Sequence, residues 1–342
     1  MVTTVSIIIP TLNSARTLGA CIGSIADQAF PRELIEIIFA DGGSSDGTLD
    51  IIEKTRSVFG ASKVKLVVNK LKTGEAGKAI GLKNASAEIV IFIDSDNFLD
   101  DSGWLKRMLE PFKDRLVAAS EPIRYTYRKK DAAITRYCAL LGMNDPLCYF
   151  LGNYDRECVL SGKWTAMPHR IYEDNDRFLT LGLDPEHLPT IGANGFSIRK
   201  SELDTLEIGD YLFDIDALRI LLEKNSAKRV AKVKIGIVHI FCGTISDFIR
   251  KQRRRISDYR LFKQQGIRKY NWQAINKAGL FYFAISCLLV FPLIFQSLRG
   301  FLRSKDPCMF LHPVFCIVTF YVYFTGSFGR SSFYSRGRWQ LN

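Results

Sequence analysis

Two aspartates separated by one residue, Asp94 and Asp96, follow a short apolar segment of the chain, Ile89–Ile93. A β-branched run of this length predicts a buried strand, so the two carboxylates would lie at its carboxyl end. Divalent cations such as Mg²⁺ take only one or two carboxylates from protein when phosphates supply the other ligands. The two carboxylates therefore suit a divalent cation that bridges to a diphosphate. Taken alone, an acidic surface loop is the alternative interpretation.

A second acid, Asp41, ends the apolar segment Ile35–Ala40 and opens a glycine-rich turn that runs to Gly47. Gly42 and Gly43 permit positive φ and allow a ligand to approach the main chain closely. This pattern predicts a nucleotide pocket in which Asp41 accepts a hydrogen bond from the base, with a plain turn as the alternative. The turn matches neither the GxGxxG dinucleotide fingerprint nor a P-loop, so those two cofactor classes lose support.

The elements that must position these acids alternate between strands and helices. Such alternation with short links predicts an α/β fold with a mostly parallel sheet and helices on both of its faces. Sheets of this kind bind ligands at the carboxyl ends of their strands, where Pro10, Asp41 and Asp94 all lie. The expected strands are Val5–Ile9, Ile35–Ala40, Val64–Val68, Ile89–Ile93 and Val230–His239, and the expected helices are Thr48–Val58, Ala76–Ala85, Tyr211–Lys224 and Ile245–Phe262; residues 100–210 are less regular.

Three segments, Val5–Asn13, Asp41–Thr48 and Asp94–Asp96, resemble in order and spacing the membrane-associated, inverting glycosyltransferases of family 2, which have the GT-A fold. The resemblance is strong over residues 4–100 and looser toward residue 260. It implies a Rossmann-like GT-A catalytic domain that takes a nucleoside-diphosphate sugar, linked to GDP or UDP. The residues it implies for donor binding are Pro10, Thr11, Asn13 and Asp41, together with Asp94.

The segment Gly74–Gly81 is similar to the stretch that precedes the metal strand in this family, which implies that Lys78 faces the donor diphosphate. The chain departs from the family pattern at two positions. Gly42 stands where a second acid is frequent in the first turn, and Asn97 stands where the metal motif often ends in a third acid.

The catalytic base of the family lies in a Glu-Asp pair that opens a helix, and the matching segment is Phe213–Arg219. Only the second acid of the pair is present, as Asp214, which the resemblance implies as the general base; Asp216 is the next candidate. Both acids also suit a helix N-terminus, where the dipole favours negative charge. The segment Gly192–Ser197 is similar to the loop around the acceptor.

A basic segment, Lys251–Ile256, resembles the Gln-x-x-Arg motif of membrane-bound members. The resemblance implies that Gln252 and Arg255 help to hold the donor diphosphate under an interfacial helix. For most of the basic side chains here, a solvated or lipid-facing position is the alternative. His239 ends a predicted strand just before this helix and is a candidate third metal ligand or a structural histidine.

The net positive charge of the chain is confined to its C-terminal part. Residues 250–342 carry 16 basic and 2 acidic residues, whereas residues 1–249 carry 31 basic and 33 acidic ones. The same part holds the most apolar stretches, so membrane lipids are the expected partner and nucleic acid is not. Eight cysteines without CxxC spacing indicate a reduced, cytosol-facing protein without a zinc site. A hydrophobic content of 47% excludes intrinsic disorder.

Two uncharged segments, Leu280–Leu298 and Cys308–Gly329, are 19 and 22 residues long. About 20 residues cross a bilayer core as a helix, so the short link between them predicts a transmembrane hairpin, with buried core helices as the alternative. The positive-inside rule makes both ends cytoplasmic. We therefore expect a multi-pass cell-membrane protein with a cytoplasmic catalytic domain. Its expected parts are a catalytic domain over 1–240, basic amphipathic interfacial helices over 241–278, the hairpin over 279–330 and a cytoplasmic tail over 331–342.

Together these patterns predict a hexosyltransferase dependent on Mg²⁺ or Mn²⁺ that transfers sugar with inversion to a hydroxyl of a lipid-linked saccharide. Asp96 and His239 would hold the metal and Asp214 would take the acceptor proton. One alternative is a polyprenyl-phosphate sugar synthase, similar to dolichol-phosphate mannose synthase, whose acceptor phosphate needs no base. A processive polysaccharide synthase and a membrane-anchored protein that binds nucleotide sugar without turnover are the others.

Overall fold

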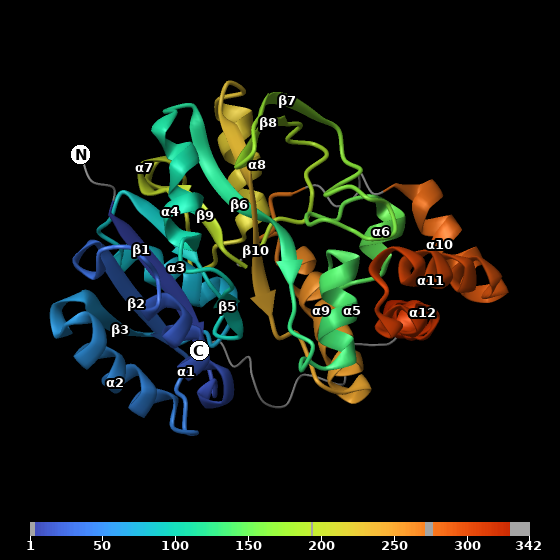
Figure 1. Cartoon of the computed structure of the whole chain (residues 1–342), viewed down its shortest axis with the longest axis horizontal. Helices are drawn as coiled ribbons and strands as arrows, with labels where there is room; N and C mark the ends of the chain where they lie inside the picture. The colour runs from blue at the N-terminus through green and yellow to red at the C-terminus, as the bar shows by residue number, and fades with distance from the viewer. Residues whose placement is uncertain (1–3, 193, 271–275, 329–342) are drawn as a thin grey trace. The chain divides into compact units, whose positions relative to one another are not determined.

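The computed structural model describes residues 4–192, 194–270 and 276–328 of the chain (Figure 1). The chain forms two compact units, one from residues 1–126 and 167–239 and the other from residues 127–166 and 240–342. Residues 127–166, which we expected in a domain over 1–240, thus pack within the second unit. The finer division into interfacial helices, hairpin and tail stays a prediction, and the tail over 331–342 lies outside the described residues.

The N-terminal part of the first unit confirms the predicted alternation of strands and helices. Its four strands pair in parallel, and β1 lies between β2 and β4. β1, β2 and β4 are buried on both faces, as is typical of parallel sheets, whereas Leu66 and Val68 of the edge strand β3 are exposed. The register sets Thr11 opposite Asp41, so the ends of β1 and β2 lie side by side. These elements are β1 (Val5–Thr11), α1 (Ala15–Ala26), β2 (Ile35–Asp41), α2 (Thr48–Phe59), β3 (Val64–Val68), α3 (Gly74–Asn84) and β4 (Ile89–Phe92).

The remaining strands extend this sheet into a mixed arrangement. Across the described residues the order is β3-β2-β1-β4-β9-β6-β10-β8-β7, with β5 paired to β10. β6 runs parallel to β10, whereas β9 is antiparallel to both β4 and β6. The elements are β5 (Asn97–Leu99), α4 (Trp104–Leu109), β6 (Val117–Thr126), β7 (His169–Asp174), β8 (Phe178–Leu183), β9 (Phe196–Arg199), α7 (Lys200–Asp204), α8 (Asp214–Lys224) and β10 (Arg229–His239). The α/β fold class is therefore confirmed.

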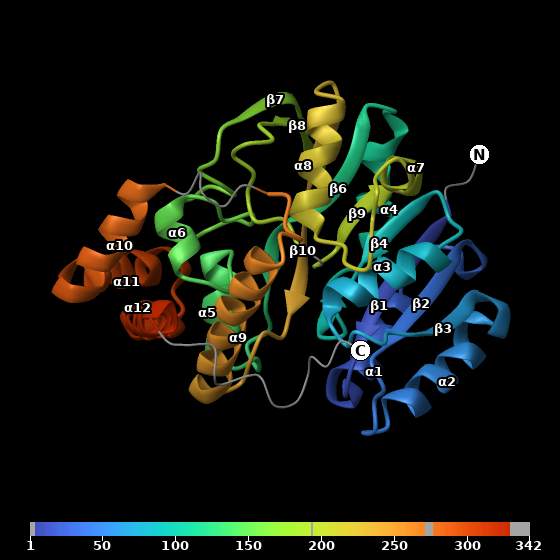
Figure 2. The same ribbon diagram turned by 180° about the vertical axis from the view of Figure 1, so that it is seen from behind.

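Helix α3 lies unusually close to β1, on the side of the sheet seen in Figure 2. A Cβ atom on Gly81 would lie 2.4 Å from Cγ2 of Ile8, and one on Gly77 would lie 2.8 Å from Cβ of Pro10. Only residues without a side chain permit this approach. Its consequence is that Lys78, which lies between the two glycines, is buried.

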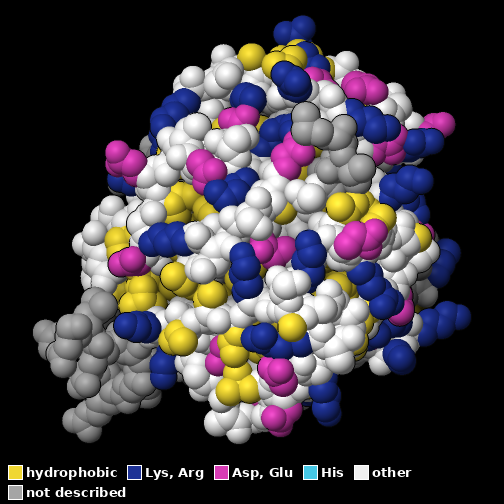
Figure 3. All heavy atoms as spheres, turned by 90° about the vertical axis from the view of Figure 1, so that its left-hand side faces the viewer, with side chains coloured by type: hydrophobic (Ala, Val, Ile, Leu, Met, Phe, Trp, Pro, Cys, Tyr) yellow, Lys and Arg dark blue, Asp and Glu magenta, His cyan; other side chains and the backbone are white. Residues whose placement is uncertain are grey.

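The face of the molecule drawn in Figure 3 carries basic and acidic side chains interspersed.

The second unit is helical. A core of aromatic, aliphatic and cysteine side chains joins α5, α9 and α12, including Tyr137, Phe248 and Phe315. All eight cysteines are buried and none forms a disulfide within the described residues. The elements are α5 (Ala133–Leu141), α6 (Leu147–Leu151), α9 (Ile245–Gln264), α10 (Lys277–Leu289), α11 (Phe291–Ser304), the 3-10 segment η5 (Pro307–Leu311) and α12 (His312–Phe328).

The predicted continuous helix over Leu280–Leu298 is wrong. The segment is divided into α10 and α11, which bend by 97° at Val290. Pro292 explains the break, because a proline beyond the first turn of a helix removes a hydrogen bond and clashes with a preceding carbonyl. Pro307–Gly326 is long and apolar enough to cross a membrane, and the bent pair passes the same test only if it is taken as one span.

Candidate active site

The Asp41 turn is held by a dense set of hydrogen bonds at the ends of β1 and β2. Its carboxylate accepts from the Thr11 hydroxyl at 2.8 Å, from the Ser44 hydroxyl at 2.6 Å, and from the backbone N–H groups of Gly43 and Ser44, both at 2.8 Å. Burial alone would raise the pKa of Asp41, but these donors, led by Ser44, hold that pKa below its usual value. Asp41 is therefore charged and has its acceptor positions filled, since a carboxylate offers about four.

Asn13 ties the end of β1 to the same turn. It adopts a positive φ of 51°, its N–H donates to the Ser44 hydroxyl, and its side-chain oxygen accepts from the N–H of Ser45. The predicted donor-binding residues Pro10, Thr11, Asn13 and Asp41 are thus all at one edge of the sheet. Their contact with a nucleotide stays a prediction.

The metal motif meets His239 because two distant strands pair beside it. β10 is antiparallel to β5, and the register sets His239 opposite Asn97, the residue after the motif. Nε2 of His239 lies 3.5 Å from Oδ1 of Asp96. Burial, and then the charge of Asp96, raise the pKa of Asp94 to about 6. The carboxylates of Asp94 and Asp96 repel one another, and a cation bound between them would reduce that repulsion.

The described residues contain no group of three or more His, Cys, Asp or Glu side chains arranged around one point as a complete metal site. Asp96 and His239 nevertheless fit a cation that draws its other ligands from a diphosphate, because such sites use few protein ligands. The predicted ligands therefore suit Mg²⁺ or Mn²⁺ only with a phosphorylated ligand present.

Lys78 and Asp214 form a buried ion pair, although 136 positions separate them in the chain. Nζ of Lys78 donates to Oδ2 of Asp214 at 2.5 Å, and both side chains are more than nine-tenths buried. Asp214 is the first residue of α8, and the N–H of Leu212 just before it donates to the carbonyl of Glu75 in α3. The link between the two helices brings the lysine and the carboxylate together.

The other carboxylate oxygen of Asp214, Oδ1, is buried and has no hydrogen-bond partner within the described part of the chain. Burial raises the pKa of Asp214 and the charge of Lys78 only partly opposes it, while burial alone would lower the pKa of Lys78 but Asp214 raises it. A buried carboxylate with one oxygen held and the other free has the form of a general base. Asp216, the second candidate, is buried as well.

Sequence reasoning assigned Lys78 to a diphosphate and did not foresee its partner. A signal was present, because Lys78 stands on a helix among Ala76, Gly77, Ala79 and Gly81, a small and apolar setting in which a lysine needs an opposite charge.

Asn97, where the family pattern has an acid, joins the metal motif to the predicted acceptor loop. Its side chain is fully buried; Oδ1 accepts from the N–H of Asp94 and Nδ2 donates to Oδ1 of Asn194, both at 3.0 Å. Asn194 in turn donates to the Tyr125 hydroxyl at 2.9 Å, and the Tyr125 ring lies 5.8 Å from that of His239. These contacts and the Asp96–His239 pair close a ring of side chains, which we call the amide ring. An acid at position 97 could not donate to Asn194.

Gln252 and Arg255 lie in the second unit, on α9. The buried Gln252 side chain donates to the carbonyl of Asn144 and accepts from Arg255 at 2.7 Å, and Arg255 pairs with Asp145 at 3.1 Å. The two predicted residues are thus brought together, with a carboxylate as the partner of the arginine. Their role toward a donor diphosphate stays a prediction.

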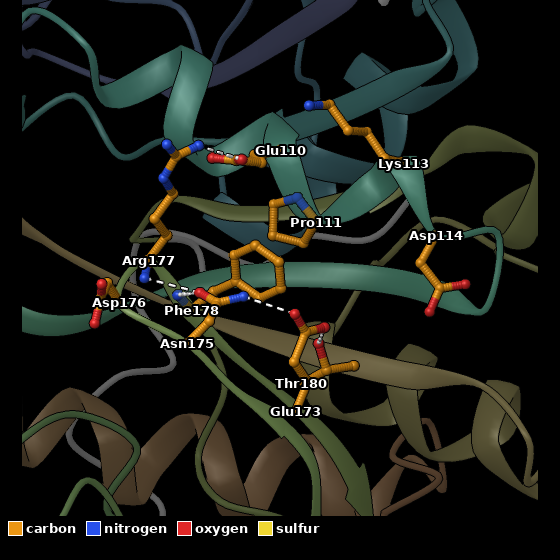
Figure 4. Close-up of a pocket in the computed structure, with 10 residues that line it drawn as sticks. All are labelled: Glu110, Pro111, Lys113, Asp114, Glu173, Asn175, Asp176, Arg177, Phe178 and Thr180. Atoms are coloured by element: carbon orange, nitrogen blue, oxygen red, sulfur yellow. Dashed lines mark hydrogen bonds and ion pairs between the residues drawn. The ribbon is translucent and has the colours of Figure 1, made fainter.

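A surface pocket of about 470 Å³ opens in the first unit, between η3 (Glu110–Lys113) and the hairpin of β7 and β8 (Figure 4). Four acids and two basic residues line it, and Arg177 reaches across to Glu110 at 2.5 Å. None of the ten lining residues is one of the predicted site residues. The acidic excess disfavours binding of a diphosphate in this pocket.

Comparison with known proteins relates part of the chain to a glycosyltransferase family. Residues 6–164 match the family model described as Glycosyl transferase family 2. The poly(ribitol-phosphate) beta-N-acetylglucosaminyltransferase TarS of Staphylococcus aureus is 27% identical over 205 residues, which are 57% of this chain and 32% of TarS. The UDP-Glc:alpha-D-GlcNAc-diphosphoundecaprenol beta-1,3-glucosyltransferase WfgD of Escherichia coli is 34% identical over 108 residues, 31% of this chain and 38% of WfgD. The chain thus covers less than half the length of either relative.

Among solved structures, the mannosyltransferase PcManGT from Pyrobaculum calidifontis, in complex with GDP-Man and Mn²⁺, superposes with a TM-score of 0.54 at 12% identity. The match covers 95% of this chain and 88% of that one. At this identity the likeness concerns the fold alone.

The amide ring predicts unequal effects of two substitutions that add the same charge. Asn97→Asp should lower the free energy of unfolding by about 1–3 kcal/mol, because two acceptor oxygens would face each other in a buried position. Asn194→Asp should cost less, since it still accepts from Asn97 and the Tyr125 hydroxyl can rotate to donate. Urea unfolding of both variants measures the difference, and an equal loss would show that the ring does not depend on the amide donor.

Proposed function

Since residues 6–164 match the model of glycosyl transferase family 2, we propose that this chain transfers a sugar, with inversion, from a nucleoside-diphosphate sugar to a hydroxyl of a membrane-associated, lipid-linked saccharide. The observation that carries the proposal is the Asp214 carboxylate, with Oδ2 held by Lys78 and Oδ1 without a partner in the described residues. The charges of Lys78 and Asp214 both act on the pKa of Asp94, after burial, Asp96 and His239, so the base and the metal motif are within electrostatic reach.

In this mechanism Oδ1 of Asp214 accepts the proton of the acceptor hydroxyl. The hydroxyl oxygen attacks the anomeric carbon of the donor sugar, and the bond from that carbon to the diphosphate breaks. Lys78 fixes the orientation of the carboxylate and favours its ionised form, which is the form that can accept a proton. The raised pKa of Asp214 makes it a stronger base than an ordinary aspartate.

Asp96 and His239 would hold a Mg²⁺ or Mn²⁺ ion, and Asp94 would contact the ion or the ribose. When bound, such an ion neutralises charge that develops on the departing diphosphate. Support comes from the 3.5 Å approach of Asp96 and His239.

The relatives support a lipid-linked or polymer-linked acceptor. WfgD is named for a diphosphoundecaprenol-linked acceptor and TarS for poly(ribitol-phosphate). The charge-free C-terminal stretches of this chain and its basic α9 favour the lipid-linked class, at a membrane surface.

One observation favours a second candidate, a polyprenyl-phosphate sugar synthase. The ammonium group of Lys78 beside Asp214 could pair with an acceptor phosphate, which is already an anion and needs no base. The two candidates differ in what they require of Asp214.

Substitution of Asp96 tests the metal. In the wild-type protein, Mn²⁺ should increase the affinity for UDP or GDP, and Asp96→Ala should abolish that increase. The affinity measured with Mn²⁺ should therefore fall by more than about tenfold, since substitution even of residues that only orient metal ligands typically costs that much. The fold should persist, because the side chain is 25% exposed at a strand end. Calorimetric titration with and without Mn²⁺ measures the effect, and Asp101→Ala, an exposed acid in the same segment, is the control. Unchanged tightening in Asp96→Ala would remove Asp96 from the metal site.

Substitution of Asp214 tests the reaction and separates the two acceptors. With a sugar hydroxyl as acceptor, Asp214→Asn should slow single-turnover transfer by about 10²–10⁴-fold at saturating donor, because the amide cannot take the proton. With a polyprenyl phosphate the loss should be small. Asp210→Asn, an exposed acid four positions upstream, is the control. A loss below about tenfold with a hydroxyl acceptor would contradict the base role.

The Lys78 pair predicts a shift in the pH profile. Asp214 must be ionised to act, so activity should fall as pH drops through its raised pKa. Lys78→Gln removes a positive charge that favours the carboxylate, so the acidic limb of the single-turnover rate should move to higher pH. Lys83→Gln, an exposed lysine on the same helix, should leave the limb in place. A limb that stays fixed in Lys78→Gln would show that another group limits the rate in acid.

A further inference from the structure

Two of the C-terminal helices carry exposed apolar stripes along one face each. Residues spaced three or four apart lie on the same side of a helix. On α11 the exposed fractions of the stripe residues range from 46% to 74%, and along η5 and α12 from 38% to 62%. The α11 stripe consists of Phe291, Ile294, Phe295, Leu298 and Leu302, and the α12 stripe of Phe310, Val314, Ile317, Tyr321 and Phe324.

The other side of each helix packs within the second unit. On α11, Leu293 is buried, Gly300 lies against Met309, and Arg303 donates to the carbonyls of Val159 and Leu160. On α12, the Phe315 ring lies 5.0 Å from that of Tyr137. Each helix therefore has one side in a protein core and one apolar side without a described covering.

Helix α12 contacts the basic helix α9 over most of its length. The Phe315 and Phe248 rings are 4.5 Å apart, the Tyr323 hydroxyl donates to Gln252 at 3.0 Å, and a Cβ on Gly326 would lie 3.1 Å from Cγ2 of Ile256. From Phe315 to Gly326 a helix rises about 16 Å.

The matching stretch of α9 contains five basic residues, Arg250, Lys251, Arg253, Arg254 and Arg255. A hydrocarbon core is about 30 Å thick, so α12 could cross it only if this contact stretch, with its basic partner, entered the core. Basic side chains at that depth are costly. The contacts therefore argue against a span by α12.

The lengths of α10 and α11 also argue against a membrane span. Its helices have 13 and 14 residues, about 20 Å each, and they meet at 97°. Neither reaches across a core of about 30 Å alone.

We propose that the C-terminal helices bind a single leaflet of an anionic phospholipid bilayer, with α11 and α12 lying in the plane of the membrane and their apolar stripes among the acyl chains. This inference replaces the transmembrane hairpin and deepens the proposed function, on which it rests for the lipid-linked acceptor alone. Helices of this kind bind through buried apolar area together with attraction to anionic headgroups.

Charge identifies the occupant as lipid. The side chain of Arg254 on α9 is 65% exposed, and Arg253 beside it and Lys305 at the end of α11 are exposed too. These cations complement anionic headgroups, whereas a second copy of the same basic surface would be repelled.

Sidedness of labelling tests the inference. The full chain would be bound to preformed vesicles of phosphatidylcholine and phosphatidylglycerol, and a single cysteine placed at Lys305, at the end of the candidate span Pro307–Gly326 that lies away from the contact between Gly326 and α9. The native cysteines are buried, so their background with a membrane-impermeant maleimide is low. Lys305→Cys should react from outside to the same extent as Ser62→Cys, an exposed position in the first unit.

A flotation assay with the same vesicles measures the stripes directly. Phe295→Gln and Leu302→Gln should each weaken vesicle binding at least about tenfold, the effect of withdrawing one large apolar side chain from lipid. Leu49→Gln, which changes a comparably exposed leucine on α2, should leave binding unchanged. Vesicles of phosphatidylcholine alone should bind the chain more weakly.

Labelling of Lys305→Cys only after detergent would overturn the proposal in favour of a span. Unchanged flotation of both stripe variants, or a stable dimer in solution that protects the stripes, would also overturn it. Donor turnover, measured separately in detergent, reports on the proposed function, so loss of that activity with normal labelling would count against the reaction and not against the membrane surface.

Discussion

The first unit depends on a pair of opposite charges that have both left water. A buried ammonium or carboxylate is tolerated only beside its counter-charge, and removing one partner of such a pair typically costs about 3–5 kcal/mol. Lys78 is buried because α3 approaches β1 through glycine, and Asp214 is buried because α8 begins beside α3. The pair therefore fixes α3, which packs against β1, relative to α8, which supplies the candidate base.

Sequence patterns predicted the elements whose character is local. β3 begins and ends where the β-branched run does, and α2, α9 and β10 agree within a residue or two. β6 and β9 escaped prediction because residues 100–210 show no clear period, and these strands are defined by partners far away in the chain. The break at Val290 escaped because composition alone suggested one apolar helix, although Pro292 was visible.

Some residues of the candidate site could likewise be predicted from local sequence patterns, and others could not. Asp41, Asp94 and Asp96 stand at strand ends, a position that an alternating pattern reveals. The partner of Lys78 and the neighbours of Asn97 are set by contacts between segments about 100 or more residues apart, for which no local pattern exists. In the sequence, Asn97 stands where the family pattern often has an acid. Its side-chain amide both donates and accepts a hydrogen bond, whereas an ionised carboxylate could only accept.

The Asp41 turn has a consequence for the energetics of ligand capture. Its carboxylate is already saturated by Thr11, Gly43 and Ser44, and Asn13 braces the same loop from the neighbouring strand. A loop built this way loses little conformational freedom when a ligand arrives, and that loss is a main opponent of binding. Ligand binding at this edge of the sheet should therefore carry a modest entropic penalty and cause little backbone movement. Any segment that becomes ordered during the reaction should lie elsewhere in the chain.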